Sequence, residues 1–338
     1  MSGGPALALV APEGPSIAPE TIVLGLPLAR RTVLAARRAG FSRVTVVGAT
    51  PALAAALQGA GAELVPEAPP GAVRLAWNVV AQTKEMRELA SGAEAVGAPV
   101  SSPADLPRAE TLLLKGLIKD TEGFMSRYFD RAISLAVSRR LAGTRITPNQ
   151  MTLIAVGIGL VAAPFFLSSR PPVQLAGGIL FLLHSILDGC DGELARLKFQ
   201  ESRSGGVLDF WGDNVVHMGI FAAMAAGLAR STGQGWPLAC GASAVLGTAV
   251  SAWVVYRRTM TGPKDGPLFT SVATRRETAV SRIADALSRR DFIYLVLIMS
   301  VFGKADWFIV LAAVAVPAFF LALLVVAWND RRVARSVS

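Results

Sequence analysis

Four aspartates near the middle of the 338-residue chain have a spacing that would bring their carboxylates together. Asp188 and Asp191 are three residues apart, so they share one face of a helix. Asp209 and Asp213 are four residues apart and share one face of the next helix. The short segment 198–204 between them predicts two antiparallel helices side by side. The two pairs of carboxylates would then face each other across one gap.

Such a gap predicts a site for divalent cations. Like charges in a partly dehydrated gap repel one another unless cations lie among them. Oxygen ligands without His or Cys favour Mg²⁺, Mn²⁺ or Ca²⁺ over zinc, and the whole chain has two His and two Cys. The weaker alternative is that the four acids are solvated at helix ends and have no function.

Small residues and one arginine accompany the aspartates. Gly192 and Gly205 present no side chain to the gap, and Ala195 presents a small one, which leaves room for a bulky ligand. Arg196 can pair with a phosphate group.

Both histidines of the chain lie one helical turn from an aspartate. His184 precedes Asp188 by four residues, and His217 follows Asp213 by four. Each could hydrogen-bond an aspartate and orient it. The alternative is a buried histidine bonded to a backbone carbonyl.

The elements that position these residues lie in a chain that is too apolar for a soluble protein. Its residues are 52% hydrophobic and 17% charged, and its mean hydropathy is +0.49. About 20 apolar residues cross ~30 Å of hydrocarbon. Six segments are candidates for membrane spans, namely Met151–Leu167, Val173–Leu187, Val207–Leu228, Trp236–Val255, Phe292–Phe302 and Trp307–Trp328.

The basic residues indicate the orientation of the spans. The net charge is +9, and most Lys and Arg residues outside the spans fall on one side of the membrane if the number of spans is even. We therefore expect an integral protein of the cell membrane with both termini and the acidic cluster on the cytoplasmic side. The basic residues meet the lipid bilayer, and the absence of a basic stripe with interleaved aromatics argues against nucleic-acid binding.

The residues before the first span read as two further parts. Residues 1–107 predict a small soluble α/β domain, because short strands alternate with helices and Ala90–Pro107 has the composition of a linker. Residues 108–146 predict a basic amphipathic helix in the membrane interface. The alternative for this helix is a cap packed on the soluble domain. Pro148 opens the next helix, with Thr147 as its cap, and residues 147–338 form the membrane domain.

The order of residues in the acidic cluster resembles a family signature. It reads Asp188, two residues, Asp191-Gly192, two residues, Ala195-Arg196, eight residues, Gly205, three residues, Asp209, three residues, Asp213. This order is similar to the signature of the CDP-alcohol phosphotransferases, and Thr147-Pro148-Asn149 resembles the start of the membrane core in that family. The resemblance implies a homodimer of six-helix transmembrane bundles with a site open to the cytoplasm.

The resemblance also implies a role for each residue. Asp188, Asp191 and Asp209 would bind metal, two ions of Mg²⁺ or Mn²⁺. Asp213 would contact metal and act as the catalytic base on the acceptor hydroxyl. The pocket for the CDP-alcohol donor would be lined by Asn149, Asp188, Gly192, Ala195, Arg196 and Gly205.

The first domain resembles the start of sugar-phosphate-type nucleotidyltransferases, on the segments 25–28, 31–34 and 39–48. Its fusion to this membrane core is similar to the bifunctional inositol-phosphate cytidylyltransferase and di-inositol-phosphate phosphate synthase proteins. The first strand is followed by Val10-Ala11-Pro12-Glu13-Gly14 without a Gly-rich basic loop, and Leu75-Ala76-Trp77-Asn78 lacks the expected metal-binding Asp. We therefore expect an inactive nucleotidyltransferase-like domain.

The acceptor is expected to be a polar alcohol, for example an inositol phosphate, and the donor CDP-diacylglycerol or CDP-inositol. A phosphorylated acceptor needs basic residues near the site, and the candidates are Arg127, Arg131, Lys198, Arg203, Arg257 and Arg258. For each of them the alternative is a topology charge or a contact with lipid headgroups.

Two other classes of protein remain as alternatives. An intramembrane cation transporter would need acids near the membrane midplane, whereas these cluster at span ends. A catalytically inactive membrane scaffold would have no need for four intact aspartates. Release of CMP would separate both alternatives from an enzyme.

Overall fold

The computed structural model describes residues 4–14, 16–48, 50–93, 97–118, 129–260 and 292–336. Its contacts divide the chain into two compact units. The first unit comprises residues 1–120, 135–145 and 193–200, and the second comprises 121–134, 146–192 and 201–338. The division into domains at residues 107 and 146 remains a prediction.

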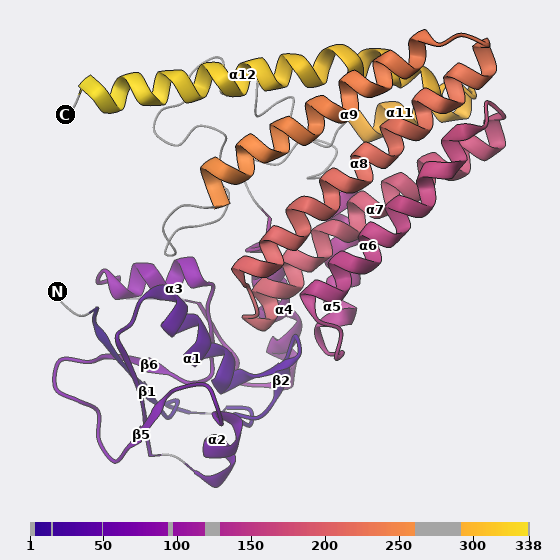
Figure 1. Ribbon diagram of the computed structural model, residues 1–338. Coiled ribbons are helices and arrows are strands. Elements are labelled where there is room, and N and C mark those ends of the chain that lie inside the picture. The colour runs from indigo at the N-terminus through magenta and orange to yellow at the C-terminus, as the bar shows by residue number, and fades with distance from the viewer. Residues whose placement is uncertain are drawn as a thin grey trace. The chain divides into compact units, whose positions relative to one another are not determined.

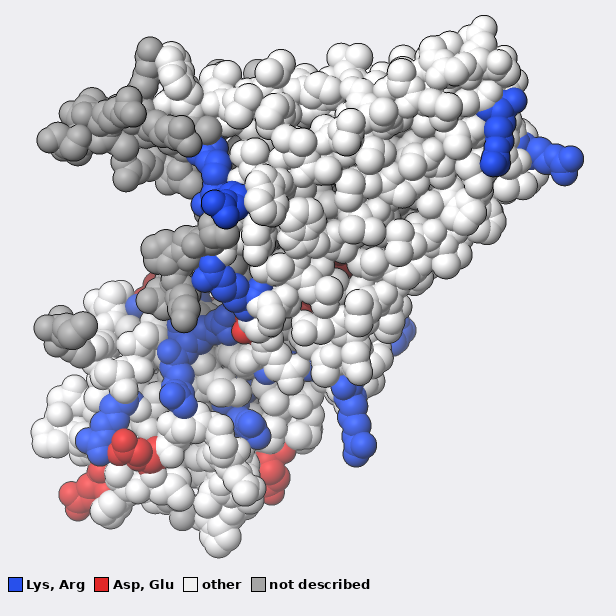
Figure 2. All heavy atoms as spheres, viewed as in Figure 1, with Lys and Arg blue, Asp and Glu red and all other residues white. Residues whose placement is uncertain are grey.

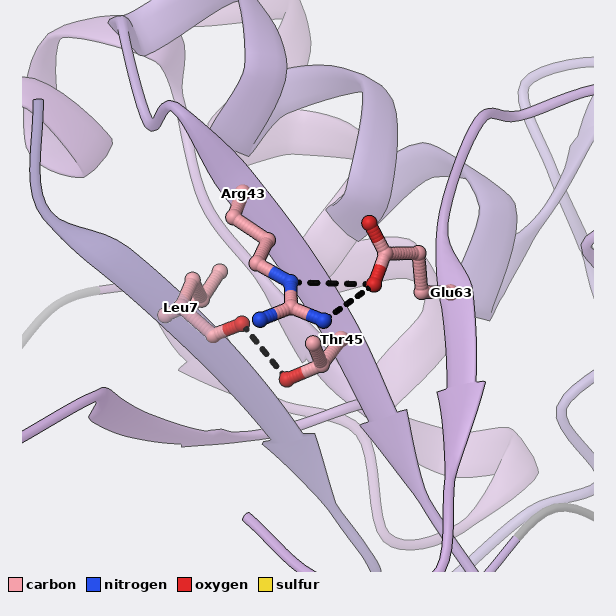
Figure 3. Close-up of polar contacts among 4 residues, drawn as sticks. All are labelled: Leu7, Arg43, Thr45 and Glu63. Atoms are coloured by element: carbon pink, nitrogen blue, oxygen red, sulfur yellow. Dashed lines mark hydrogen bonds and ion pairs between the residues drawn. The ribbon is translucent and has the colours of Figure 1, made fainter. Parts of the chain in front are cut away.

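The first unit is built on a four-stranded parallel sheet, as the alternation of strands and helices predicts. The strand order is β5-β4-β1-β6, formed by Glu63–Val65, Arg43–Val47, Ala6–Val10 and Val73–Ala76 (Figure 1). Residues Leu7 and Leu9 of the central strand β1 are fully buried. At the edge, Arg43 forms an ion pair with Glu63, and Thr45 donates a hydrogen bond to the Leu7 carbonyl at 3.2 Å (Figure 3).

Helices and two small antiparallel pairs of strands complete this unit. The helices are α1 (Leu28–Ala39), α2 (Pro51–Ala56), α3 (Thr83–Ala90), α4 (Leu106–Lys115) and the later part of α5 (Arg131–Ala142). One pair is a hairpin of β2 (Ile22–Val23) and β3 (Leu26–Pro27), and in the other pair β7 (Val79–Val80) meets β8 (Ala98–Pro99) after the intervening helix α3. Helix α1 ends where Gly40 takes a left-handed conformation, with φ of 103°.

A buried arginine holds the turn of the hairpin between β2 and β3. Arg31 is 2% exposed and donates hydrogen bonds to the carbonyls of Val23 and Leu24. Burial lowers the pKa of Arg31 to about 10, and Glu110 acts against this shift. Leu24 has a positive φ of 45°, a conformation that is costly for leucine. The hydrogen bonds from Arg31 hold the backbone in this turn.

One sequence expectation before the first span needs correction, and another stays a prediction. The expected linker Ala90–Pro107 contains β8, the short helix η1 (Pro103–Asp105) and the start of α4. Helix α4 buries Ala109 and Leu113 in the core of the first unit, as in the alternative of a packed cap. The composition misled because small and proline residues also suit a hairpin edge and a helix start. A position of residues 108–146 in the membrane interface remains a prediction.

The second unit is a bundle of long apolar helices. They are α6 (Pro148–Ala162) with its extension η3 (Ala163–Leu167), α7 (Pro171–Lys198), α8 (Arg203–Thr232), α9 (Trp236–Val255) with η4 (Tyr256–Met260), α11 (Phe292–Val301), η5 (Ala305–Trp307) and α12 (Phe308–Ser336) (Figure 1). Within the described residues, five helices are long and apolar enough to cross a membrane. The chain is an integral membrane protein.

Two helices are longer than the sequence predicts, and the fifth expected span is short among the described residues. In this part of the chain, α11 covers 10 residues of that span, too few to cross the hydrocarbon alone. Helices α7 and α8 have 28 and 30 residues, because Glu193–Lys198 continues α7 mostly in good helix formers and Ser202 caps α8 ahead of its apolar stretch. The connection shortens to 199–202, and the four aspartates lie inside the helices.

The start of α6 agrees with the sequence expectation. Thr147 caps the helix by accepting a hydrogen bond from the Gln150 amide at 3.3 Å, and the Gln150 side chain accepts one from the Thr147 amide at 2.9 Å. Pro148 follows at the first helical position. This capping box fixes the residue at which the membrane helix begins.

The surface of the second unit is apolar, as a lipid-facing surface must be. Large side chains such as Leu246, Val314 and Phe302 are more than 60% exposed. Figure 2 shows the corresponding broad area without charged side chains. The buried core between the helices contains Phe166, Phe181, Ile220, Met224, Leu228 and Ile309.

Candidate metal centre

Three of the four aspartates form a compact group in the second unit. Asp188 and Asp191 lie on α7, and Asp209 lies on α8. One carboxylate oxygen from each lies within 4.8 Å of the others. Asp188 is 3% exposed and Asp191 is 7% exposed. The antiparallel arrangement predicted from the spacing therefore brings these residues together.

The donor set of this group fits a hard divalent cation. It offers three carboxylates from two rigid helices, and Mg²⁺ and Mn²⁺ prefer such oxygen ligands. Burial makes the mutual repulsion of three ionised carboxylates severe unless positive charge lies among them. The residues therefore fit the ions that the sequence predicts.

A threonine from the first span supports the group. Thr152 on α6 is buried, and its hydroxyl donates a hydrogen bond to Oδ2 of Asp191. Sequence reasoning missed this residue. The available signal was a polar side chain in an otherwise apolar segment, one helical turn after Pro148.

Two predicted pocket residues lie next to each other. A Cβ atom placed on Gly205 would lie 2.9 Å from Oδ1 of Asn149 and 3.0 Å from Oγ of Ser202. Ser202 accepts a hydrogen bond from the Gly205 amide at 3.0 Å and so caps α8. The absence of a side chain at Gly205 therefore allows Asn149 to approach the start of α8.

The remaining predicted pocket residues lie on α7. Gly192 falls in the second unit with the aspartates. Ala195 and Arg196 belong by their contacts to the first unit. Their contribution to a nucleotide pocket remains a prediction.

The predicted acceptor residues lie in different surroundings. Arg131 on α5 lies against α7 at Gly189, the residue after Asp188, because its Nη1 is 3.4 Å from the position that a Cβ of Gly189 would take. Lys198 belongs to the first unit and donates to the Thr144 carbonyl at 2.9 Å. Three arginines make contacts elsewhere in the second unit, Arg203 with the Met260 carbonyl, Arg258 with the Leu323 carbonyl and Arg257 with the Trp253 ring. Arg127 lies outside the described residues.

The fourth aspartate contacts a histidine. Nε2 of His184 lies 3.6 Å from Oδ1 of Asp213, one helical turn beyond Asp209 on α8. Nδ1 of His184 lies 2.9 Å from the Ala155 carbonyl oxygen. The contact with a backbone carbonyl agrees with the second alternative for His184. The carboxylate in its ion-pair contact is Asp213 and not Asp188, and an orienting role for His184 stays a prediction. The ring of His217 packs against Phe181, Phe221 and Phe292.

Comparison with known proteins identifies the class of this helical unit. Residues 145–276, which include all four aspartates, match the CDP-alcohol phosphatidyltransferase family.

The more similar relatives share one name. The bifunctional IPC transferase and DIPP synthase of Thermococcus kodakarensis is 41% identical over 127 residues, which are 37% of this chain and 28% of that protein. The protein of the same name from Rubrobacter xylanophilus is 35% identical over 184 residues, 51% of this chain and 40% of that protein. The chain thus aligns with less than half the length of these relatives.

One solved structure shows a weak likeness. The match with the crystal structure of Mycobacterium tuberculosis phosphatidylinositol phosphate synthase with CDP-DAG bound covers 57% of this chain and 94% of that chain. The identity is 16% and the TM-score is 0.39.

Proposed function

We propose that this protein is a membrane transferase of substituted phosphate groups, a CDP-alcohol phosphotransferase. It would move a phosphate-linked group from a CDP-alcohol to an acceptor alcohol and release CMP, in phospholipid or inositol-phosphate-type synthesis. The observation that carries the proposal is the compact group of Asp188, Asp191 and Asp209, on two neighbouring helices of the segment that matches the family.

The aspartates would bind two ions of Mg²⁺ or Mn²⁺. Asp188, Asp191 and Asp209 would supply ligands, and Asp213 would add a further oxygen. Metal bound there would neutralise charge on the pyrophosphate of the donor and so stabilise CMP as the leaving group. Asn149, Gly192, Ala195, Arg196 and Gly205 would line the donor pocket.

Asp213 would act as the general base. It takes the proton from the acceptor hydroxyl, and the acceptor oxygen forms a bond to the β-phosphorus of the donor. The bond between that phosphorus and the oxygen of CMP breaks in the same displacement. Asp213 contacts His184, and it is not one of the three aspartates in the compact group. This difference supports a separate role for Asp213.

The acceptor would be an inositol phosphate. The shared name of the more similar relatives supports this choice, and so does the position of Arg131 beside Gly189. A guanidinium group at this point can pair with a phosphate of the acceptor in two hydrogen bonds. CDP-inositol and CDP-diacylglycerol are the donors to test.

The larger arrangement follows from the same proposal. A sixth span that includes α11 would complete a bundle with both termini and the site on the cytoplasmic side, and the protein would act as a homodimer. Residues 1–107 would form an inactive nucleotidyltransferase-like domain. In support of this, Asn78 follows β6, where a metal-binding Asp is expected, and its side chain instead donates to the Val100 carbonyl at 3.1 Å.

The test is release of CMP by purified protein in detergent with Mg²⁺. Each donor is offered with inositol phosphate, inositol, glycerol phosphate or serine. We expect CMP with inositol phosphate, and its loss in Asp213→Asn with donor binding retained. CMP release by Asp213→Asn at the rate of the parent protein would refute the role of the base. No CMP with any pair, from folded protein that binds metal and CDP, would favour a scaffold or a transporter.

A further inference from the structure

His184 is anchored between three helices of the second unit. It lies on α7 and is 1% exposed, and its ring nitrogens reach residues on α6 and α8. Nδ1 lies 2.9 Å from the Ala155 carbonyl oxygen. A carbonyl oxygen only accepts hydrogen bonds, so Nδ1 carries the proton of this contact. The backbone of α6 thereby fixes which edge of the ring faces α8.

The packing around the ring prevents it from turning. A Cβ atom on Gly159 would lie 2.9 Å from Cγ of His184, so the ring occupies space that a side chain at residue 159 would take. Phe181 lies nearly parallel to the ring, with an interplanar angle of 5° and centroids 6.1 Å apart. Gly159 on α6 and Phe181 on α7 thus form a pocket that restricts the orientation of the His184 ring.

The other edge of the ring faces Asp213. Nε2 lies 3.6 Å from Oδ1 of Asp213, whose side chain is 15% exposed. The anchored ring therefore stands beside one oxygen of this carboxylate and limits how the side chain can turn. The second oxygen of Asp213 would remain for the acceptor.

We propose that His184 is a positioning residue, which holds the carboxylate of Asp213 in the orientation needed to accept the proton of the acceptor hydroxyl. This inference rests on the proposed function, because it concerns the residue proposed there as the base. It adds a residue outside the Asp, Gly, Ala and Arg positions of the signature. His184 acts through Asp213 and touches neither substrate.

Two amide variants separate the two contacts of the ring. His184→Asn keeps a polar group near Nδ1 and loses the group at Nε2, whereas His184→Gln places an amide nitrogen near Nε2. We expect His184→Asn to lower kcat for CMP release about 10²-fold, because misplacement of a catalytic group has effects of that order. KM for the donor should change little. His184→Gln should retain most of kcat.

A matched control loosens the same pocket without removing a polar contact. Phe181→Leu keeps both nitrogens of His184 and replaces the aromatic ring that packs beside them by a smaller side chain. We expect it to lower the Tm and to lower kcat much less than His184→Asn, because the group that faces Asp213 is still present. Equal losses of kcat in Phe181→Leu, His184→Gln and His184→Asn would show a merely structural role and overturn the proposal.

A spectroscopic measurement tests the contact without turnover. The chain has two histidines, so a protein labelled with ¹⁵N-histidine gives signals from two rings only. The signals lost in His184→Asn identify His184. We expect Asp213→Asn to shift the Nε2 signal of His184 and to leave its Nδ1 signal nearly unchanged.

The outcomes separate this inference from the proposed function. Unchanged His184 signals in Asp213→Asn would show that the contact does not exist. Full kcat in His184→Asn, together with an inactive Asp213→Asn, would overturn the positioning role and leave the proposed function standing. A parent protein that releases no CMP would refute the proposed function, and the positioning role with it.

Discussion

At the scale of single residues, the carboxylates of the candidate metal centre have uncharged neighbours. Thr152 donates to Asp191, and Gly205 leaves space for Asn149. Groups that hydrogen-bond a metal ligand fix its orientation and tune its affinity. The spacing of the aspartates predicted which carboxylates would meet. It could not predict Thr152, because this contact joins α6 to α7 and depends on how the two helices pack.

Thr152→Val tests this support. Valine has nearly the same shape and lacks the hydroxyl, so Asp191 loses one hydrogen bond while the packing is kept. We expect the Mg²⁺ concentration for half-maximal CMP release to rise about 10- to 100-fold, the usual effect of removing such a partner. Thr152→Ser is the matched control and should remain close to the parent protein. A parent-like requirement for Mg²⁺ in Thr152→Val would contradict this role.

At the scale of elements, small residues set the distance between membrane helices. Helix α8 comes close to η3 at Gly227, where a Cβ would collide with the Phe166 carbonyl oxygen and lie 3.2 Å from the Leu167 Cα. These are backbone atoms, so no side chain can move aside. Close approach of this kind is how helices associate in lipid, where the hydrophobic effect contributes little.

Gly227→Ala should therefore destabilise the bundle. Alanine favours a helix over glycine by about 1 kcal/mol, but overpacking against backbone costs ~1–3 kcal/mol. We expect a lower Tm in detergent. Gly219→Ala on the same helix is the control, because its Cβ would meet only Leu160 and Ala163, at 3.6 and 4.0 Å. An unchanged or higher Tm in Gly227→Ala would show that α8 and η3 do not pack this closely.

Element boundaries show what sequence patterns can and cannot predict. The strand Ala6–Val10, the helix Leu28–Ala39 and the capped start at Thr147 were predictable, because each depends on local propensity or on local hydrogen bonds. The strand Val73–Ala76 was missed, because its exposed Arg74 breaks the apolar run and its pairing with β1 is non-local. The ends of α7 and α8 were missed for a similar reason, since hydropathy marks the membrane core and not the end of a helix.

At the scale of the whole molecule, the composition predicts a chain with two parts. The first unit has a parallel sheet, and the second consists of apolar helices with exposed aliphatic side chains. A division of the chain at residues 107 and 146 does not describe the two units fully. By their contacts, the later segments 135–145 and 193–200 belong to the first unit. Membership of these two segments in the first unit depends on long-range contacts, which the local composition does not indicate.

The central claim is that the buried aspartate group supports metal-dependent transfer from a CDP-alcohol. The most direct measurement is CMP release by the parent protein before and after removal of divalent metal with a chelator, followed by addition of Mg²⁺ or Mn²⁺. We predict that activity disappears, that it returns with either ion, and that Asp191→Asn is inactive under all conditions. CMP release that persists in the chelator, or an Asp191→Asn variant as active as the parent protein, would contradict the account.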